Sequence, residues 1–240
     1  MKIAGIVTAR GGSKSIIKKN IIQINGMPLL HYPLLSLINS KHNISTYVNT
    51  DCSDIAYSAS LLGVENIERP EKLAGDTINH GDVIIDACQQ VIHQIGNVDI
   101  FIILLGNTVM IDSMIVDKCI DTLSSSDASS VITVWEAADD HPYRALKLSS
   151  DGYLGEFNKR NVCTDRHSYN KAYFFDQGVW AIKSEFVFDR TGPSPWYWLG
   201  PRVKPIIREW ITGRDINGPF DVPFHELWDK LKITPKEFNY

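Results

Sequence analysis

Residues 3–14 read Ile3-Ala4-Gly5-Ile6-Val7-Thr8-Ala9-Arg10-Gly11-Gly12-Ser13-Lys14, and this stretch decides the fold of the 240-residue chain. The apolar run Ile3–Val7 is typical of a strand buried on both faces of a parallel sheet. Adjacent glycines let backbone N–H groups turn inward and approach a phosphate closely. We therefore predict a first strand followed by a polyphosphate-binding loop at its carboxyl end. The alternative is a solvated basic turn.

Cations are concentrated at this loop. Four of them fall within ten residues, with two neutral hydrogen-bonding side chains among them: Arg10, Lys14, Lys18 and Lys19, with Ser13 and Asn20. The chain as a whole is slightly acidic, with a net charge of −4 and an isoelectric point near 6.0. The loop is thus a local basic feature on an acidic background, and nucleic acid is not an expected partner.

Two familiar phosphate loops are excluded by spacing. The Walker loop needs Gly-x-x-x-x-Gly-Lys-Ser/Thr, but Ser13 stands between Gly12 and Lys14. The dinucleotide fingerprint needs Gly-x-Gly-x-x-Gly, but the next glycine after Gly12 is Gly26. A loop of the nucleotidyltransferase type remains.

The rest of the chain alternates between strand and helix patterns, which favours one α/β domain over residues 1–240. We predict strands at 44–48, 64–67, 98–105, 130–135 and 169–182, and helices at 28–39, 51–62, 81–95, 112–123, 186–190 and 222–231. Asp51 and Asp221 are expected to cap the helices that they begin. Asp151-Gly152 predicts a hairpin turn between strands at 146–149 and 153–157. The polar segment 158–170 is expected to be a substrate loop.

The phosphate loop, followed by Lys19-Asn20, resembles the signature of the acylneuraminate cytidylyltransferases. Two later blocks extend the resemblance, namely Arg69-Pro70-x-x-Leu73-Ala74-x-Asp76-Thr77 and Asp215-Ile216-Asn217-x-x-x-Asp221. The resemblance implies a three-layer, Rossmann-like nucleotidyltransferase fold with a mostly parallel sheet. It also implies that residues 140–172 form a small projecting β-hairpin lobe used for dimerisation. The implied reaction transfers CMP from CTP to the anomeric hydroxyl of a sialic-acid-like 2-keto sugar acid and releases pyrophosphate.

The resemblance also implies roles for individual residues. Arg10, Lys14 and Asp215 would be catalytic. The nucleotide would be bound by Ala9, Arg10, Gly11, Gly12, Ser13, Lys14, Asn20, Arg69, Asn79 and Asn107. The sugar acid would be bound by Thr108, Arg144, Lys171 and Gln177. Mg²⁺ or Mn²⁺ would be held by Asp215 and Asn217, because hard cations prefer oxygen ligands and need only one or two carboxylates beside phosphate.

The chain departs from the family pattern at several positions. Gly106 replaces a glutamine that contacts the nucleotide, Phe175 replaces an arginine for which Lys171 is the nearest substitute, and Asn217 replaces the middle aspartate. The cluster Trp196-Tyr197-Trp198 has no counterpart in the pattern; it is expected to line a substrate pocket, cover a subunit interface or pack in the core.

A cytoplasmic homodimer without membrane association is expected. The four cysteines form no Cys-x-x-Cys pair, the chain starts with a strand instead of a leader, and apolar runs such as Ile100–Leu105 fall far below the ~20 residues of a membrane helix. Three alternatives stay open. One is a nucleotidyltransferase for another sugar, one is a GT-A-like glycosyltransferase, and one is an inactive nucleotide-binding homologue.

Overall fold

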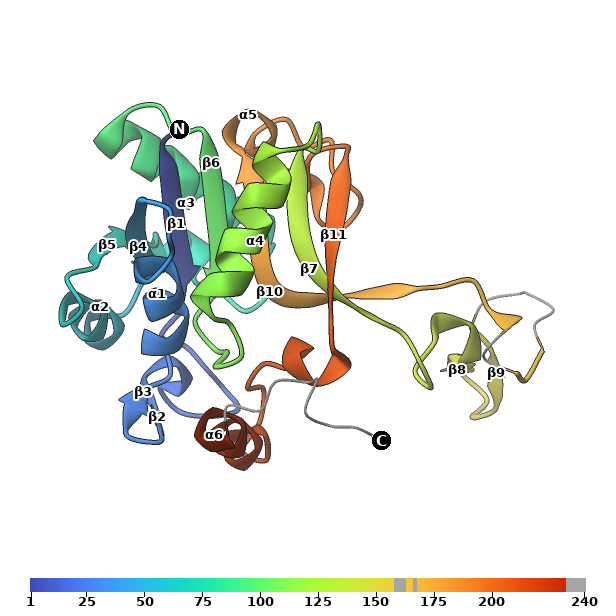
Figure 1. Ribbon diagram of the computed structural model, residues 1–240. Helices are drawn as coiled ribbons and strands as arrows, with labels where there is room; N and C mark the ends of the chain where they lie inside the picture. The colour runs from blue at the N-terminus through green and yellow to red at the C-terminus, as the bar shows by residue number, and fades with distance from the viewer. Residues whose placement is uncertain (158–162, 166–167, 232–240) are drawn as a thin grey trace.

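The computed structural model describes residues 1–157, 163–165 and 168–231. A seven-stranded sheet forms the centre, in the order β11-β7-β10-β6-β1-β4-β5 (Figure 1). Its strands are β1 (Ile3–Thr8), β4 (Ile44–Thr50), β5 (Glu65–Glu68), β6 (Ile100–Leu105), β7 (Ser130–Glu136), β10 (Tyr173–Lys183) and β11 (Val203–Arg208). Only β10 runs antiparallel to its neighbours in this sheet. The predicted, mostly parallel α/β fold is confirmed.

Helices cover both faces of the sheet and make three layers (Figure 1). One face carries α1 (His31–Ile38), α2 (Ser53–Ser60) and α4 (Ser113–Ser124), and the other carries α3 (His80–Ile95) and α5 (Ser184–Val187). Alternation along β6 explains this arrangement: Ile102 and Leu104 join the first core cluster, while Phe101 and Ile103 join the second. The last described helix is α6 (Asp221–Leu231), which contacts β2 (Gln23–Ile24), the strand paired with β3 (Met27–Pro28).

The carboxyl ends of the central strands lie level with one another. Thr8 at the end of β1 is paired with Asn49 of β4 on one side and with Leu105 of β6 on the other. The next residues continue this alignment, because Ala9 N donates to Asn49 O at 3.0 Å and Gly106 N donates to Thr8 O at 3.0 Å. Three loops therefore converge on one edge of the sheet, where α/β folds bind ligands.

Strand β11 was not predicted. It lies at the sheet edge, pairs only with β7 and contains Pro205, which has no N–H to donate to a ladder. Lys204 and Ile206 share one face of the strand, yet Lys204 is exposed and Ile206 is buried, so no strict alternation marks the segment. A strand of this kind is recognisable only once its partner is known.

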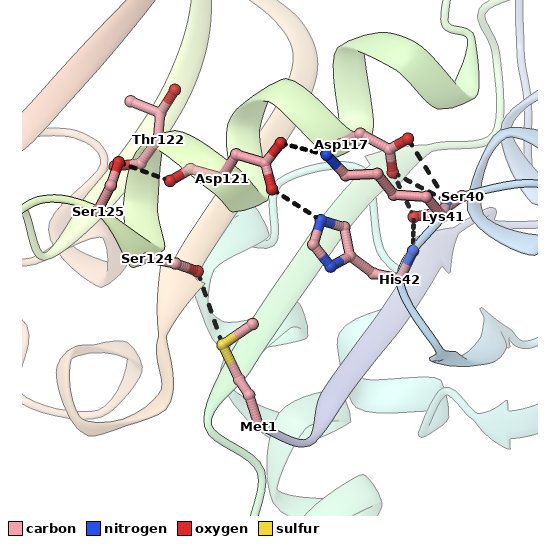
Figure 2. A network of polar contacts seen from close by, with 9 residues as sticks. All are labelled: Met1, Ser40, Lys41, His42, Asp117, Asp121, Thr122, Ser124 and Ser125. Carbon is pink, nitrogen blue, oxygen red and sulfur yellow. Dashed lines mark hydrogen bonds and ion pairs between the residues drawn. The ribbon is translucent and has the colours of Figure 1, made fainter.

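The opposite, amino edge is tied together by a polar network around the loop between α1 and β4 (Figure 2). Ser40 Oγ donates to Asp117 Oδ1 at 2.5 Å, and Lys41 Nζ and His42 Nε2 reach the two oxygens of Asp121 at 2.6 and 3.0 Å. Both aspartates belong to α4. A pocket of about 470 Å³ lies beside this loop, against Leu62–Val64. The network anchors the loop at the edge away from the phosphate loop.

An arm projects from the sheet where β7 ends and β10 begins (Figure 1). It carries the hairpin of β8 (Leu146–Leu148) and β9 (Leu154–Glu156), close to the predicted bounds. The predicted substrate loop 158–170 falls partly outside the described residues, at 158–162 and 166–167. No helix in the described part of the chain is both long and apolar enough to cross a bilayer.

Candidate functional site

The phosphate loop is held at both ends by side chains from neighbouring segments. Gly11 N donates to Asp51 Oδ1 at 2.9 Å, and Asn20 Nδ2 donates to Arg10 O at 2.9 Å. The predicted capping role of Asp51 is wrong, because Cys52 is the N-cap residue of α2 and no side chain caps that helix. Asp51 instead fixes the first glycine of the loop. A Cβ on Gly11 would lie 2.7 Å from Cys52 Cβ, so the loop backbone packs where only glycine fits.

Asp76 binds the two principal cations of the loop. Arg10 Nη1 lies 2.6 Å from Asp76 Oδ1, and Lys14 Nζ pairs with Asp76 Oδ2. Hydrogen bonds from Lys14 and then Arg10 lower the pKa of Asp76, which stays ionised. Arg10 and Lys14 thus share one carboxylate from the segment between β5 and α3, so their charges converge on one point above the sheet.

Lys19 is the cation beside the acidic C-terminal motif. Its Nζ donates to Ile216 O at 2.7 Å, next to Asp215. Burial lowers the pKa of Lys19, and the charge of Arg10 adds to that effect while Asp215 opposes it. The phosphate loop and the 215–217 segment are therefore electrostatic neighbours through Lys19, which the sequence marked as a loop cation and as part of the family signature, without a link to Asp215.

Asp215 is held between two asparagine amides. Asn107 Nδ2 donates to Asp215 Oδ2 at 2.7 Å, and Asn217 Nδ2 donates to Asp215 Oδ1 at 2.7 Å. Ile216 N also donates to Asn107 O at 2.9 Å, which joins the loop after β6 to the same segment. Each carboxylate oxygen keeps a second acceptor position, so this set fits a hard cation that takes its other ligands from phosphate and water. No cluster of three or more His, Cys, Asp or Glu side chains suited to a metal occurs among the described residues.

Asp221 does not cap α6 as predicted. Its Oδ2 accepts hydrogen bonds from Asn217 N at 2.8 Å and from Gly218 N at 2.7 Å, both of which precede the helix. The carboxylate shapes the turn that carries Asn217. On α6 itself, burial lowers the pKa of His225 to about 4, so this imidazole is neutral beneath the acidic motif.

Arg69 and Asn79 both make hydrogen bonds within the chain that give them structural roles. Arg69 is buried, with Nε donating to Asn49 Oδ1 at 3.0 Å and Nη2 to Asn49 O at 3.2 Å, and burial lowers its pKa to about 10. Asn79 Oδ1 accepts from Gly81 N at 2.9 Å and caps α3. Nucleotide contacts by either residue stay predictions.

Gly106 packs directly against the phosphate loop. A Cβ there would lie 2.8 Å from Ala9 Cβ and 3.2 Å from Leu30 Cδ1. A glutamine at this position does not fit in the observed backbone arrangement, which explains the departure from the family pattern. Thr108 is buried, and its Oγ1 accepts from Met110 N at 3.3 Å.

A bulge interrupts β10 at the same sheet edge. Gln177 has a φ of 54° and an exposed side chain there. Asp176 is buried and accepts from Thr133 Oγ1 at 2.5 Å, from Gly178 N at 2.8 Å and from Arg208 Nη1 at 3.2 Å. Arg208 Nη2 also donates to Met110 O, so this cation of β11 joins the bulge to the loop after β6. Sequence reasoning missed Arg208 because it missed β11.

Arg144 and Lys171 lie on the arm and do not join the loop residues within one chain. Arg144 pairs with Asp139 at 3.2 Å, and Lys171 pairs with Glu136 at 3.0 Å. The arm leads away from the edge where β1 and β6 end (Figure 1).

Comparison with known proteins gives consistent similarities. A sequence model of the family described as cytidylyltransferase matches residues 4–175. Post-translational flagellin modification protein B of Campylobacter coli is 26% identical over 235 residues, covering 97% of both chains. The CMP-N,N'-diacetyllegionaminic acid synthase of Campylobacter jejuni is 24% identical, again with 97% of both chains covered. A solved CMP:2-keto-3-deoxy-manno-octonic acid synthetase, complexed with CTP, superposes with a TM-score of 0.69 at 13% identity, covering 97% of this chain and 100% of that one. The likeness to this solved structure supports the assignment of the fold alone.

Proposed function

The chain belongs to the cytidylyltransferase family, and we propose that it transfers CMP from CTP to the anomeric hydroxyl of a sialic-acid-like 2-keto sugar acid, releasing pyrophosphate. One full-length relative is named as a synthase of a CMP-linked acid, which supports an acid of this type as the acceptor. The observation that carries the proposal is the convergence of Arg10 and Lys14 on Asp76, beside Lys19 and Asp215.

Arg10 and Lys14 would bind the triphosphate of CTP. Asp76 now accepts from both, Arg10 at one carboxylate oxygen and Lys14 at the other, so an anionic group with two oxygens fits between the two side chains. A triphosphate offers more charge than one half-exposed carboxylate and would take over these contacts. The backbone N–H of Gly12 and the hydroxyl of Ser13 would add neutral donors, in keeping with the cradle that such loops form.

The reaction needs positioning and charge stabilisation more than covalent chemistry. The acceptor hydroxyl oxygen bonds to the α-phosphorus, the bond from that phosphorus to the pyrophosphate oxygen breaks, and the hydroxyl proton passes to solvent. Arg10, Lys14 and Lys19 would offset the negative charge that grows on the leaving group. Burial raises the pKa of the Cys119 thiol to about 12 and raises the pKa of the Cys88 thiol well above its usual value, so neither is an available nucleophile.

Asp215 would hold the divalent cation, with Asn217 and Asn107 orienting its carboxylate. Bound there with the triphosphate, Mg²⁺ or Mn²⁺ would supply charge neutralisation at the phosphates. Since one carboxylate is present where the family pattern has two, we expect weaker metal affinity than a two-carboxylate site gives.

The test measures pyrophosphate release by the purified full chain with Mg²⁺. Incubation with CTP and an N-acylated 2-keto sugar acid is expected to give turnover, whereas ATP, GTP and UTP are expected to give little. Preference for another nucleotide, or for a neutral sugar phosphate as acceptor, would indicate that the chain is a different kind of transferase. CTP binding without turnover at saturating Mg²⁺, with any 2-keto sugar acid, would indicate an inactive homologue.

The arm supports the proposal that the working unit is a homodimer. Its hairpin exposes large apolar side chains, namely Leu146, Leu148, Tyr153, Leu154 and Phe157, each between 59% and 72% exposed. A two-stranded hairpin is marginal by itself in water, and a contiguous apolar surface of this kind marks an interface. A second copy of the chain would cover it and receive Arg144 and Lys171 near its own substrate site.

Sedimentation of the full chain is expected to give a dimer, and Leu148→Asp is expected to shift it to monomer by burying an unpaired charge in the interface. Tyr57→Asp serves as the matched control, because Tyr57 is 68% exposed on α2, away from the arm. A monomeric parent chain, or an equal effect of both variants, would contradict the proposed use of the arm.

A further inference from the structure

A continuous series of aromatic rings starts at the phosphate loop and runs across the α3 face of the sheet. His80 Nε2 lies 3.1 Å from Thr8 Oγ1, at the residue that immediately precedes the loop. The His80 ring centroid lies 5.5 Å from that of Trp180 and 6.4 Å from that of Trp198. Phe175 follows at 5.0 Å from Trp180, and Trp196 stacks on Phe175 at 4.5 Å with an interplanar angle of 23°.

The series has a buried layer and an outer layer. Trp180 and Trp198 are 2% and 3% exposed and belong to the core on this face. Phe175 and Trp196 are half-buried and rest on that core. The two outer rings, Phe175 and Trp196, are called the aromatic shelf below. Core packing explains the buried tryptophans, but it leaves one side of the shelf uncovered by the described residues.

The segment that carries Trp196 packs against α3 through its neighbouring residues. A Cβ on Gly81 would overlap the Trp198 ring, so the 196–198 segment packs directly against the first turn of the helix. Asp82 accepts from Tyr197 Oη at 2.9 Å and from Arg190 Nη2 at 2.8 Å. These contacts fix the segment next to Trp196 before any ligand binds, which lowers the entropy cost of ordering that part of the shelf.

The shelf lies at the ligand-binding edge of the sheet. Trp180 of β10 is paired with Ile103 of the antiparallel strand β6, and β6 ends at Leu105. The chain between Phe175 and Trp180 therefore passes the carboxyl end of β6, the edge at which Thr8 ends β1. An acceptor that reaches the α-phosphate of a nucleotide on the loop would extend over this edge.

The surface that the aromatic series offers is apolar and uncharged. Packing around His80, aided by the charge of Arg69, lowers the pKa of the imidazole to about 4, so it is neutral near pH 7. The nearby cations are engaged elsewhere, Arg190 by Asp82 and Arg208 by Asp176. Flat aromatic faces bind methyl and acyl groups well and leave hydroxyl groups without partners.

We propose that the aromatic shelf binds an apolar substituent of the acceptor sugar acid, an acyl or deoxy methyl group, and makes the enzyme prefer acylated acids over fully hydroxylated ones. The inference rests on the proposed function, because it assigns a specificity element to that same site. The expected acceptor is a sugar acid in which methyl groups replace part of the polar surface of the sugar.

The test compares kcat/KM for two acceptors, a 2-keto sugar acid with two acylamino groups and a fully hydroxylated 2-keto sugar acid. Trp196→Ala and Phe175→Ala are each expected to lower the preference for the acylated acid about tenfold or more, the usual effect of losing apolar contact in a pocket. The KM for CTP is expected to change by less than about twofold, because the shelf does not touch the loop cations. Phe175→Leu keeps the apolar volume and is expected to retain most of the preference.

Tyr57→Ala is the matched control, since it removes an exposed aromatic ring from α2. Equal loss for both acceptors, or a preference that survives both alanine variants with unchanged thermal stability, would overturn the shelf assignment. A parent enzyme that prefers the fully hydroxylated acid would overturn it as well. If the parent chain turns over no 2-keto sugar acid with CTP, the proposed function itself fails, and that result is distinct from the other outcomes.

Discussion

Replacing Arg10 with alanine is expected to lower kcat/KM for CTP by about 10²- to 10³-fold, the usual cost of removing one preorganised donor to a developing anion. Lys14→Ala is expected to lower kcat/KM for CTP by a similar factor. Both side chains now contact a single carboxylate, Asp76, so they are already positioned to act on one anionic group together. The measurement is steady-state pyrophosphate release at saturating acceptor, with calorimetric titration of CTP as a second readout.

Lys18→Ala is the control for this prediction. Lys18 lies in the same basic stretch, but its Nζ pairs with Asp54 at 2.5 Å and its side chain is 60% exposed. Its removal is expected to change kcat/KM by less than about threefold, since an exposed ion pair contributes little. Thermal melting would confirm that all three variants are folded. Full activity of both Arg10→Ala and Lys14→Ala would refute the phosphate-loop assignment.

Much of the fold was predictable because its central strands are buried on both faces. β1 and β6 are continuous apolar runs, and the helix periodicities of α3 and α4 place their apolar residues against them. The edge strand β11 lacks that signal, since one side has no partner strand and Pro205 is tolerated there. A strand buried on both faces is recognisable in the sequence as a continuous apolar run, whereas the edge strand β11 leaves no such pattern.

The candidate site was predictable only in part, for a related reason. Local motifs singled out Arg10, Lys14 and Asp215, because each lies in a recognisable block of neighbouring residues; their catalytic roles stay predictions. Partners from distant segments left no such pattern. Asp51 was expected to cap α2 but instead accepts from Gly11, and its role depends on β1 and β4 being neighbours in the sheet.

Arg208 shows the same limitation more sharply. Phe175 stands where the family pattern has an arginine, so Lys171 was the nearest cation to consider along the chain. The structure pairs Lys171 with Glu136 and brings Arg208 of β11 to the bulge instead, where it binds Asp176. A strand that is distant in sequence can supply an arginine when it lies nearby in the sheet. The order of strands in the sheet cannot be read from a local stretch of sequence, so Arg208 could not be predicted.

Asp215→Asn is expected to lower turnover by about 10²- to 10³-fold at a fixed, moderate Mg²⁺ concentration, because it removes the only carboxylate that the proposal assigns to the metal. Asn217→Asp instead adds a second carboxylate beside Asp215. Asn217 Nδ2 already lies 2.7 Å from Asp215 Oδ1, so a carboxylate there would put two anionic groups side by side. A metal relieves that repulsion, and the variant is expected to need about tenfold less Mg²⁺ for half-maximal activity.

Titration of Mg²⁺ and Mn²⁺ against initial rates measures both effects, and isothermal titration of the metal in the presence of CTP gives a readout without turnover. Asp229→Asn is the control, because Asp229 lies near the C-terminal end of α6, accepts from Asn25 Nδ2 and Tyr32 Oη, and takes no part in the proposed metal site. If Asp215→Asn kept its full rate, or Asn217→Asp left the Mg²⁺ requirement unchanged, the cation would have to be bound elsewhere. The loop cations would then face the triphosphate without a carboxylate-held metal opposite them, and Lys19, which sits beside Asp215, would be the remaining source of positive charge on that side.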